Sequence, residues 1–134
     1  TTAAAEDLAV GEIVAATSVN PLADEVKHAY DAPFPDASYK AAVLEFPGLI
    51  PIAESMAGVE ENRQAWQLLE RWHKPFMTAF SDSDPTTKAW ETVFQQRVPG
   101  AQKIRHREIK KAGHFVQEEQ AVEFAASILA MLKA

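Results

Sequence analysis

The sequence predicts an α/β fold in which parallel β-strands alternate with helices. Three observations predict it: an apolar run at residues 75–80, a segment at residues 103–109 in which charged and apolar residues alternate, and helical patterns before, between and after them. A strand that is apolar on both faces is typical of a parallel sheet, because helices cover both faces of such a sheet. The alternating segment is expected to be a second strand with one wet face.

Helical patterns dominate the first half of the chain. Residues 6–17 show apolar residues three to four positions apart, which predicts a short helix. Asn20 followed by Pro21 is a good helix start, with Asn as the N-cap and Pro at the first helical position, so a second helix is expected to run to about Tyr30. We expect a third helix at residues 37–46.

The segments between these helices contain proline and glycine. Residues 31–36 are expected to be extended, because Pro33 and Pro35 each disfavour helix in the residue before them. Asp36 can then cap the helix that follows. The prolines and glycine at residues 47–51 break the chain, and residues 53–59 are expected to form a loop.

The second half alternates helices with the two strands. Residues 60–72 and 86–97 are expected to be helical, and residues 118–133 are expected to form a strong closing helix. The apolar face of that closing helix consists of Val122, Ala125, Ile128, Leu129 and Leu132. Two parallel strands make a sheet too narrow to be stable in water, so further strands must pair with them from a segment absent from these residues. We therefore expect the chain to be the C-terminal half of a larger folded unit.

Composition excludes several classes of function. The chain has 134 residues, 47% hydrophobic and 24% charged, and its formal net charge of −6 argues against a nucleic-acid partner. The N-terminal segment has neither a basic start nor a long apolar core, so we expect no signal peptide, no membrane anchor and no membrane partner. The absence of cysteine excludes disulfides and is compatible with a reducing compartment, so a cytoplasmic location is expected.

The most informative residue is His114, which follows Asp84 by 30 positions. Each residue lies on the loop that leaves a predicted strand, and in open parallel sheets such loops meet at the edge where sites are built. Strand, acid, helix, strand and histidine is the layout of the second half of an α/β-hydrolase catalytic triad, whose order is nucleophile, acid, base. Asp84 would fix the tautomer of His114, leaving the other ring nitrogen free to take a proton. Gly113 permits a tight turn before the histidine.

Two alternatives stay open at this site. Asp82 competes with Asp84 for the role of the acid, and spacing from the strand does not separate them. The structural alternative is a surface histidine beside a helix start, with an aspartate that only caps the helix at residue 86. No convincing nucleophile stands upstream of the pair.

No cofactor or metal is expected. His28, His73 and His106 are interpreted as structural, and the sequence contains no HExxH motif, no cysteine and no close pair of histidines. It also lacks the GxGxxG and GxxxxGK[ST] motifs, so nothing indicates a nucleotide.

Four segments carry a likeness to a known family. They are residues 29–40, which contain Tyr-Asp-Ala-Pro-Phe-Pro-Asp, residues 45–47 (Glu-Phe-Pro), residues 74–85, with Lys-Pro-Phe at the start and Phe-Ser-Asp-Ser-Asp-Pro at the end, and residues 112–118 (Ala-Gly-His-Phe-Val-Gln-Glu). Together they closely resemble the haloalkane dehalogenases, from about Leu22 onward. The first segment resembles a specific signature of the family's cap region, whereas the Asp and His motifs alone indicate only an α/β-hydrolase. The chain order resembles the subgroup whose acid follows the strand just before the histidine-bearing one.

The resemblance implies a fold and a reaction. Residues 1–52 would be the latter part of the helical cap, and residues 53–134 the C-terminal part of the α/β-hydrolase core, with its last two parallel strands and flanking helices. The family uses an Asp nucleophile to displace halide from small apolar substrates, forms an alkyl ester, and needs no cofactor. By resemblance, His114 would activate the water that hydrolyses the ester and Asp84 would orient His114. Phe46, Pro47 and Ile50 would line the apolar substrate pocket, although a packing role is an equal alternative.

The departures from the family concern what lies upstream. The family's nucleophile and its halide-holding tryptophans precede the segment matched here, and Trp66, Trp72 and Trp90 are expected to pack against the sheet. We therefore expect the chain alone to be inactive. The expected partner is the missing N-terminal half, on the same or a separate polypeptide, or a second copy in a swapped homodimer. The alternative functions are another cap-bearing hydrolase, such as an epoxide hydrolase, and a non-enzymatic dimerisation or binding module.

Overall fold

Two short parallel strands, β1 (Ala79–Ser81) and β2 (Arg107–Ile109), form the sheet in the part of the chain that the structure describes. This computed structural model describes residues 8–133. The register pairs Ala79 with Arg107, Phe80 with Glu108, and Ser81 with Ile109. Both strands are shorter than the predicted segments 75–80 and 103–109. Each strand has one hydrogen-bonded neighbour in the described residues, which limits how far regular pairing extends.

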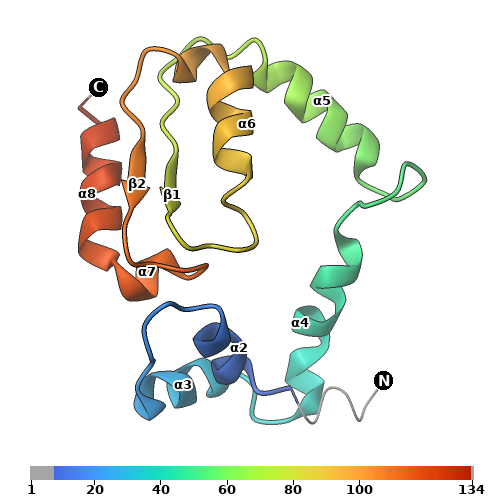
Figure 1. Cartoon of the computed structure of the whole chain (residues 1–134). Coiled ribbons are helices and arrows are strands. Elements are labelled where there is room, and N and C mark those ends of the chain that lie inside the picture. The colour runs from blue at the N-terminus through green and yellow to red at the C-terminus, as the bar shows by residue number, and fades with distance from the viewer. Residues whose placement is uncertain (1–7, 134) are drawn as a thin grey trace. The chain divides into compact units, whose positions relative to one another are not determined.

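Helices flank this pair of strands. Helix α6 (Trp90–Arg97) and the 3₁₀ turn η3 (Pro99–Ala101) connect β1 to β2, and α7 (Val116–Glu119) and α8 (Ala121–Met131) follow β2. Figure 1 shows α6 beside β1 and α8 beside β2, with α7 at the end of the sheet where both strands finish. Two parallel strands with flanking helices confirm the predicted α/β class.

The chain divides into two compact units. One consists of Leu22–Ala65 with the segment that ends at Ala16, and the other consists of Thr17–Pro21 with the chain from Trp66 onward. The first unit contains α2 (Val10–Ala16), α3 (Asp24–Asp31), η1 (Ala37–Lys40), α4 (Ala41–Glu45) and η2 (Phe46–Leu49). Helix α5 (Val59–Leu69) crosses the boundary. Residues 1–7, where the predicted helix 6–17 and cap segment 1–52 begin, lie outside the described residues.

Helices α2 and α3 pack closely in the first unit. Gly11 lies against the backbone of Lys27, so a larger side chain at this position would collide with the Lys27 carbonyl. The amide of Gly11 also donates to the Asp31 carboxylate at 2.9 Å. Further along, Asp36 caps η1 as predicted, because its side chain accepts from the Ser38 amide at 2.8 Å.

The core of the second unit is small and lies around the strands. Val98, Ala101, Ile109 and Ala112 are its fully buried apolar side chains among the described residues. Burying one side chain the size of valine or isoleucine contributes about 1.5–3 kcal/mol. These residues lie at the ends of the strands and of α6, so they hold together the loops that leave the sheet.

An aromatic cluster joins α5 to α6. Trp66 stacks on Phe94 with ring centroids 5.2 Å apart and on Trp90 at 6.3 Å, and Phe76 stacks on Phe94 at 5.8 Å. The Arg97 guanidinium lies 4.2 Å from the centroid of the Trp66 ring. Trp66 and Trp90 therefore have a packing role that accounts for their presence.

The helix start predicted at Asn20–Pro21 is wrong. Helix α3 begins at Asp24, with Ala23 in the N-cap position. Asn20 instead donates from its backbone and side chain to Glu119, and from its side chain to the Lys111 carbonyl. These contacts with residues about 90–100 positions away hold the segment outside the helix, and the local capping preference is overridden.

The closing helix also differs from its prediction. It breaks at Gln120 into α7 and α8, and its predicted apolar face is exposed rather than packed. Val122 is 86% exposed and Leu132 is 78% exposed, whereas Ser127 is buried. The apolar residues therefore lack a packing surface in the described part of the chain. No helix among residues 8–133 combines the length and apolar character needed to cross a bilayer.

Candidate active site

Asp84 and His114 meet at the edge of the sheet where both strands end. His114 Nδ1 lies 3.1 Å from Asp84 Oδ1, and the two residues are 30 positions apart in the chain. Each follows its strand by a few residues, and the ends of parallel strands share one edge. The structure therefore places side by side the two residues that the sequence analysis singled out.

Asp84 is a buried, heavily hydrogen-bonded carboxylate. Its residue is 6% exposed, and it accepts hydrogen bonds from the Thr86 amide at 2.8 Å, the Thr87 hydroxyl and His114. Burial raises the pKa of this carboxyl, but the hydrogen bonds from Thr87, Thr86 and His114 outweigh it and hold the pKa below the usual range of aspartate. Asp84 is therefore ionised near neutral pH.

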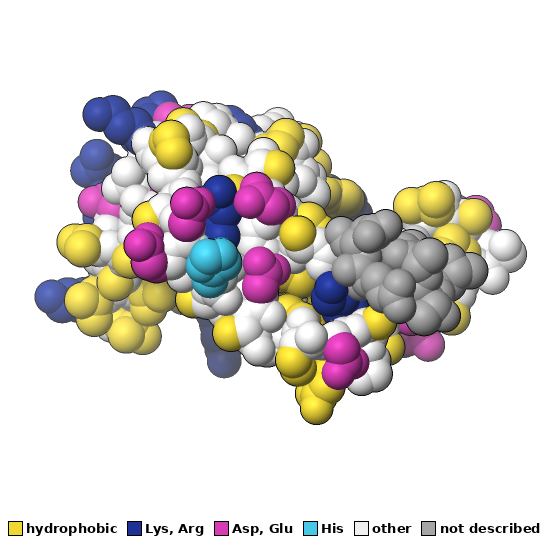
Figure 2. Space-filling view, turned by 90° about the horizontal axis from the view of Figure 1, so that it is seen from below, with side chains coloured by type: hydrophobic (Ala, Val, Ile, Leu, Met, Phe, Trp, Pro, Cys, Tyr) yellow, Lys and Arg dark blue, Asp and Glu magenta, His cyan; other side chains and the backbone are white. Residues whose placement is uncertain are grey.

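The ionised partner sets the tautomer of His114. A carboxylate only accepts hydrogen bonds, so Nδ1 of the neutral ring must carry the proton and donate it. The lone pair of Nε2 then remains available to take a proton. The His114 side chain is 35% exposed, so its ring can reach solvent. Figure 2 shows acidic side chains, which contribute to the negative net charge, on the face of the molecule seen from below. The arrangement can therefore act as a base toward water and stabilise the imidazolium that results.

The structure separates the two candidate acids. Asp82 has other hydrogen-bond partners: its Oδ1 accepts from the Ser83 hydroxyl at 3.0 Å and from the Ala112 amide at 3.4 Å. It therefore braces the loop after β1 against the loop after β2. Asp84 is the carboxylate that His114 meets.

The loop that carries His114 is tied to the strand ends. The Ser81 hydroxyl donates to the Gly113 carbonyl at 2.6 Å, and the His114 amide donates to the Thr17 carbonyl at 3.0 Å. A Cβ atom on Gly113 would collide with that same Thr17 carbonyl. The tight turn predicted at Gly113 is thus required by a close approach of two backbone segments.

Sequence comparison shows which known proteins this chain is similar to. A haloalkane dehalogenase of Psychrobacter cryohalolentis is 42% identical over 116 residues, which cover 87% of this chain and 38% of that protein. Similar proteins of the same name are 40% identical in Mycobacterium marinum, over 91% of this chain, and 37% identical in Mycolicibacterium paratuberculosis, over 95% of it. Over most of its length, the chain is therefore similar to haloalkane dehalogenases.

The matches cover most of this chain but less than half of each relative. The chain spans about two fifths of the length of the curated relatives it matches, from 38% to 42%. A search of protein-family models found no match. Because the relatives are α/β-hydrolases, the two parallel strands and their helices form part of an α/β-hydrolase core, as predicted.

One residue beside the pair of Asp84 and His114 was missed by the sequence analysis. Glu119 accepts from the Gly113 amide at 2.6 Å and from the amides of Val19 and Asn20 at 2.8 and 2.7 Å. Burial raises its pKa, but the hydrogen bonds from Gly113 and Asn20 hold it below the usual range of glutamate. No local pattern could have found this role, because two of the partners lie about 100 positions upstream.

The predicted pocket residues of a dehalogenase lie in the other unit. Phe46 and Pro47 are part of η2, and Ile50 follows it. Phe46 is 65% exposed, and Ile50 is also exposed. Their apolar surfaces are open to a ligand or to further chain, and a role in substrate binding stays a prediction.

The other histidines of the second unit differ from His114. His106 uses both ring nitrogens: Nδ1 lies 3.2 Å from the Thr78 amide and Nε2 lies 3.0 Å from the Ala101 carbonyl. It thus bridges two backbone segments, as a structural histidine does. His73 lines a cavity of about 330 Å³ together with Lys103, but this cavity lies at the opposite edge of the sheet, before β1 and β2 begin.

Metal binding finds no support in the described residues. Within residues 8–133, no three acidic or histidine side chains converge as a metal site requires.

Proposed function

We propose that Asp84 and His114 are the acid and base of a hydrolase that cleaves carbon–halogen bonds in small apolar haloalkanes. The observation that carries this proposal is the 3.1 Å contact between His114 Nδ1 and the buried carboxylate of Asp84, which leaves Nε2 available for a proton. The relatives are named for haloalkane rather than epoxide cleavage, which favours this substrate class.

The reaction has two steps. A carboxylate nucleophile attacks the carbon that bears the halogen; a carbon–oxygen bond forms, and halide leaves with the bonding electrons. His114 Nε2 then takes a proton from water, whose oxygen attacks the carbonyl carbon of the alkyl ester. The alcohol leaves with the proton returned by the imidazolium, and the carboxylic acid that remains loses its proton to solvent, which regenerates the carboxylate nucleophile. Asp84 keeps the proton of neutral His114 on Nδ1, and it stabilises the positive charge while the imidazolium exists. No cofactor enters.

We also propose that the nucleophile comes from outside these 134 residues. A nucleophile elbow needs a strand that leads into it, and it precedes the acid in the order nucleophile, acid, base. Within residues 8–133, β1 is the first strand, and it leads into the loop of Asp84. The N-terminal half of the fold, on the same or a separate polypeptide, would supply the nucleophile. Halide release by the chain alone should then be absent.

The division into cap and core belongs to the same proposal. Residues 1–52 correspond to the latter part of a helical cap and residues 53–134 to the core that carries the acid and base. The exposed side chains of Phe46 and Ile50 would give the cap an apolar surface for a haloalkane. Pro47, between them in η2, would fix the backbone that presents these side chains.

Fusion to the upstream part of a relative tests the reaction. We would join the chain to the segment of the Psychrobacter cryohalolentis relative that precedes the matched region and measure halide release from short bromoalkanes. The fusion should turn over repeatedly. His114→Gln should release one equivalent of halide and stop, because the ester forms and is not hydrolysed. Asp84→Asn should lower kcat by about 10³–10⁴-fold, as loss of the orienting acid does in other triads.

A matched control is available on α3. His28→Gln replaces an exposed histidine outside the proposed site and should leave halide release unchanged. Repeated turnover by His114→Gln, or a folded wild-type fusion that releases no halide, would contradict the proposal.

A second candidate is a non-enzymatic binding or dimerisation module. The observation that favours it is the exposed apolar face of α8, because exposed apolar patches mark interaction surfaces. Two copies that exchange an element would bury such a face. A stable dimer of the chain that persists when the upstream segment of a relative is added would favour this candidate over the enzyme.

A further inference from the structure

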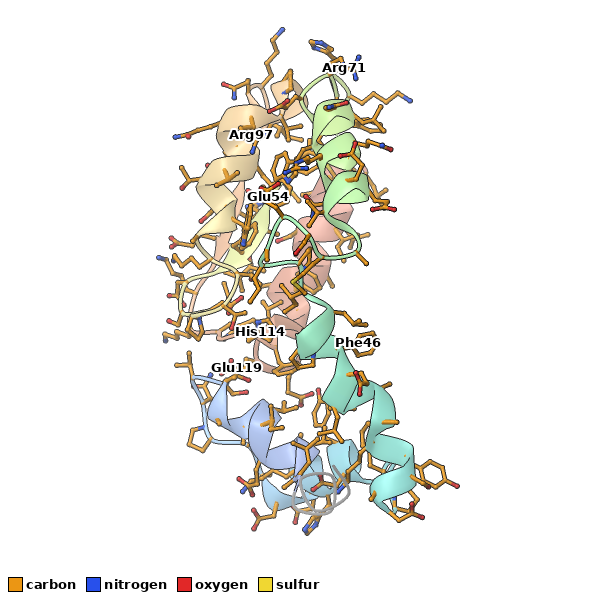
Figure 3. All side chains as sticks on the ribbon, turned by 90° about the vertical axis from the view of Figure 1, so that its right-hand side faces the viewer. Phe46, Glu54, Arg71, Arg97, His114 and Glu119 are labelled. Atoms are coloured by element: carbon orange, nitrogen blue, oxygen red, sulfur yellow. The ribbon has the colours of Figure 1, made fainter. Side chains whose placement is uncertain are left out.

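Glu119 lies at the end of α7, five residues after His114, and gathers hydrogen bonds from two separate backbone segments. Its Oε2 accepts from the Gly113 amide at 2.6 Å. Its Oε1 accepts from the Val19 amide at 2.8 Å and from the backbone amide and side-chain nitrogen of Asn20 at 2.7 and 2.8 Å. Figure 3 shows His114 and Glu119 near each other.

The segment Thr17–Pro21, here called the strap, lies along the loop of His114. Besides the bonds to Glu119, the Thr17 carbonyl accepts from the His114 amide at 3.0 Å, and Gly113 is packed against that carbonyl. Asn20 also donates to the Lys111 carbonyl at 3.2 Å. The strap and the loop both belong to the second unit, so these contacts lie within one compact body.

The carboxylate is the group best suited to join these segments. It offers acceptor positions only, and Val19, Asn20 and Gly113 each reach it with an N–H donor. A glutamine at this position would turn its NH₂ group toward one of those donors and lose that bond. Hydrogen bonds to a charged acceptor are also roughly twice as strong as neutral ones.

The two halves of the acid–base pair are held differently. Asp84 is fixed by its own turn, through the Thr86 amide and the Thr87 hydroxyl. His114 lies on a loop followed by α7, a helix of four residues that has little stability of its own. The position of the imidazole therefore depends on what ties down its loop.

We propose that Glu119 is a positioning residue for His114: its carboxylate clamps the strap to the histidine loop and so keeps Nδ1 in contact with Asp84. The meaning of this clamp for catalysis rests on the proposed function, since His114 must be the base for its position to matter. The clamp itself is a property of the folded chain and needs no substrate.

The test measures which ring nitrogen of neutral His114 carries the proton. In the isotope-labelled full chain, ¹⁵N chemical shifts of the neutral imidazole give the fraction of each tautomer, with His114→Gln as the assignment control. Wild type should be almost wholly Nδ1–H. In Glu119→Gln the Nε2–H form should become measurable, because the loop no longer holds Nδ1 against Asp84. Amide exchange at Gly113 should accelerate about tenfold, as expected for the loss of one charged hydrogen bond.

Two further variants make the result decisive. Glu123→Gln makes the same charge change at an exposed position on α8 and should alter neither readout. Asn20→Ala removes one donor to Glu119 while leaving the carboxylate, so it should shift the tautomer in the same direction by a smaller amount. It also covers the case in which Glu119→Gln fails to fold.

Several outcomes would overturn the proposal. An unchanged tautomer in folded Glu119→Gln would do so, and so would an equal shift in Glu123→Gln, which would indicate a general effect of charge. If Glu119→Gln unfolds and Asn20→Ala leaves the tautomer unchanged, Glu119 is only a structural residue. Failure of the proposed function looks different, because it would appear as absent halide release with the tautomer shift intact.

Discussion

One buried carboxylate determines what His114 can do. Asp84 receives its hydrogen bonds from a backbone amide, a hydroxyl and the imidazole, and each of them needs an acceptor. An aspartate that only capped a helix would need just the first two. The third bond fixes the tautomer of His114, and it is the feature that distinguishes an acid–base pair from a cap.

Replacing this acceptor tests its contribution to stability. Asp84→Asn should lower the free energy of unfolding by about 1–3 kcal/mol, because an amide NH₂ would face a donor in a buried site. Urea unfolding measures the difference. Asp82→Asn is the matched control two residues away, and its loss should be at most about 0.5 kcal/mol, since Asp82 is more exposed. Equal losses in both variants would contradict the special role of Asp84.

The pKa directions predict how stability depends on pH. Hydrogen bonds hold the pKa values of Asp84 and Glu119 below their usual ranges in the folded chain. Their stabilisation is therefore fully present above the ordinary carboxyl pKa of about 4, and it is lost as the pH falls through the lower folded values. The free energy of unfolding, measured by urea titration, should fall steeply below about pH 4.

The control for this pH dependence uses the same two positions. The double variant Asp84→Asn, Glu119→Gln should start less stable at neutral pH and lose less stability on acidification, because the two depressed carboxyls no longer take up protons on unfolding. Glu123→Gln should keep the wild-type slope. A double variant with an unchanged slope would assign the acid sensitivity to other groups.

At the scale of elements, the loops after the two strands form the site. The loop after β1 carries Asp84 and the loop after β2 carries His114, and the Ser81 hydroxyl joins them through the Gly113 carbonyl. The strap adds a third backbone segment. Three backbone segments therefore converge on a turn that leaves no space for a side chain at Gly113.

A methyl group at this turn should be costly. Gly113→Ala should lower the free energy of unfolding by about 1–3 kcal/mol, because its Cβ would collide with the Thr17 carbonyl and force the backbone to move. The tautomer of His114 should shift as well, since the same movement carries its loop. Gly48→Ala is the control: nothing lies within 4 Å of a Cβ there, so it should be neutral or slightly stabilising in thermal unfolding. If Gly113→Ala lowers the free energy of unfolding no more than Gly48→Ala does, the inferred crowding at Gly113 is wrong.

At the scale of the whole molecule, many large apolar side chains stay exposed in the described part of the chain. Val122 and Leu132 on α8 are exposed at 86% and 78%, and each strand has one hydrogen-bonded neighbour in the described part. Exposed apolar faces and open strand edges favour association. The chain should therefore bind further α/β-hydrolase structure or a second copy.

Association in solution provides the measurement. The 14.7 kDa chain should form a heavier species as its concentration rises in analytical ultracentrifugation. The double variant Val122→Lys, Leu132→Lys should weaken this association and change the free energy of unfolding of the monomer little, because neither side chain is buried. A wild-type chain that stays monomeric at every concentration would contradict the expectation.

The sequence by itself determined the α/β class, the order of the elements around the strands, and the placement of Asp84 and His114 on two loops at one sheet edge. Local patterns suffice for this, because apolar runs predict buried strands and loops after parallel strands share an edge. The tight turn at Gly113 was also predicted, because a glycine next to a loop residue is visible in the local sequence.

Only the tertiary structure decided which carboxylate meets the histidine, where α3 begins, and that Glu119 joins the strap to the site. Asp82 and Asp84 stand two positions apart, and only their different packing separates them. Asn20 has every local mark of an N-cap, yet hydrogen bonds to residues 91 and 99 positions away hold it outside the helix. Contacts this distant in the chain form only when the fold brings both ends together, so no window of sequence contains them.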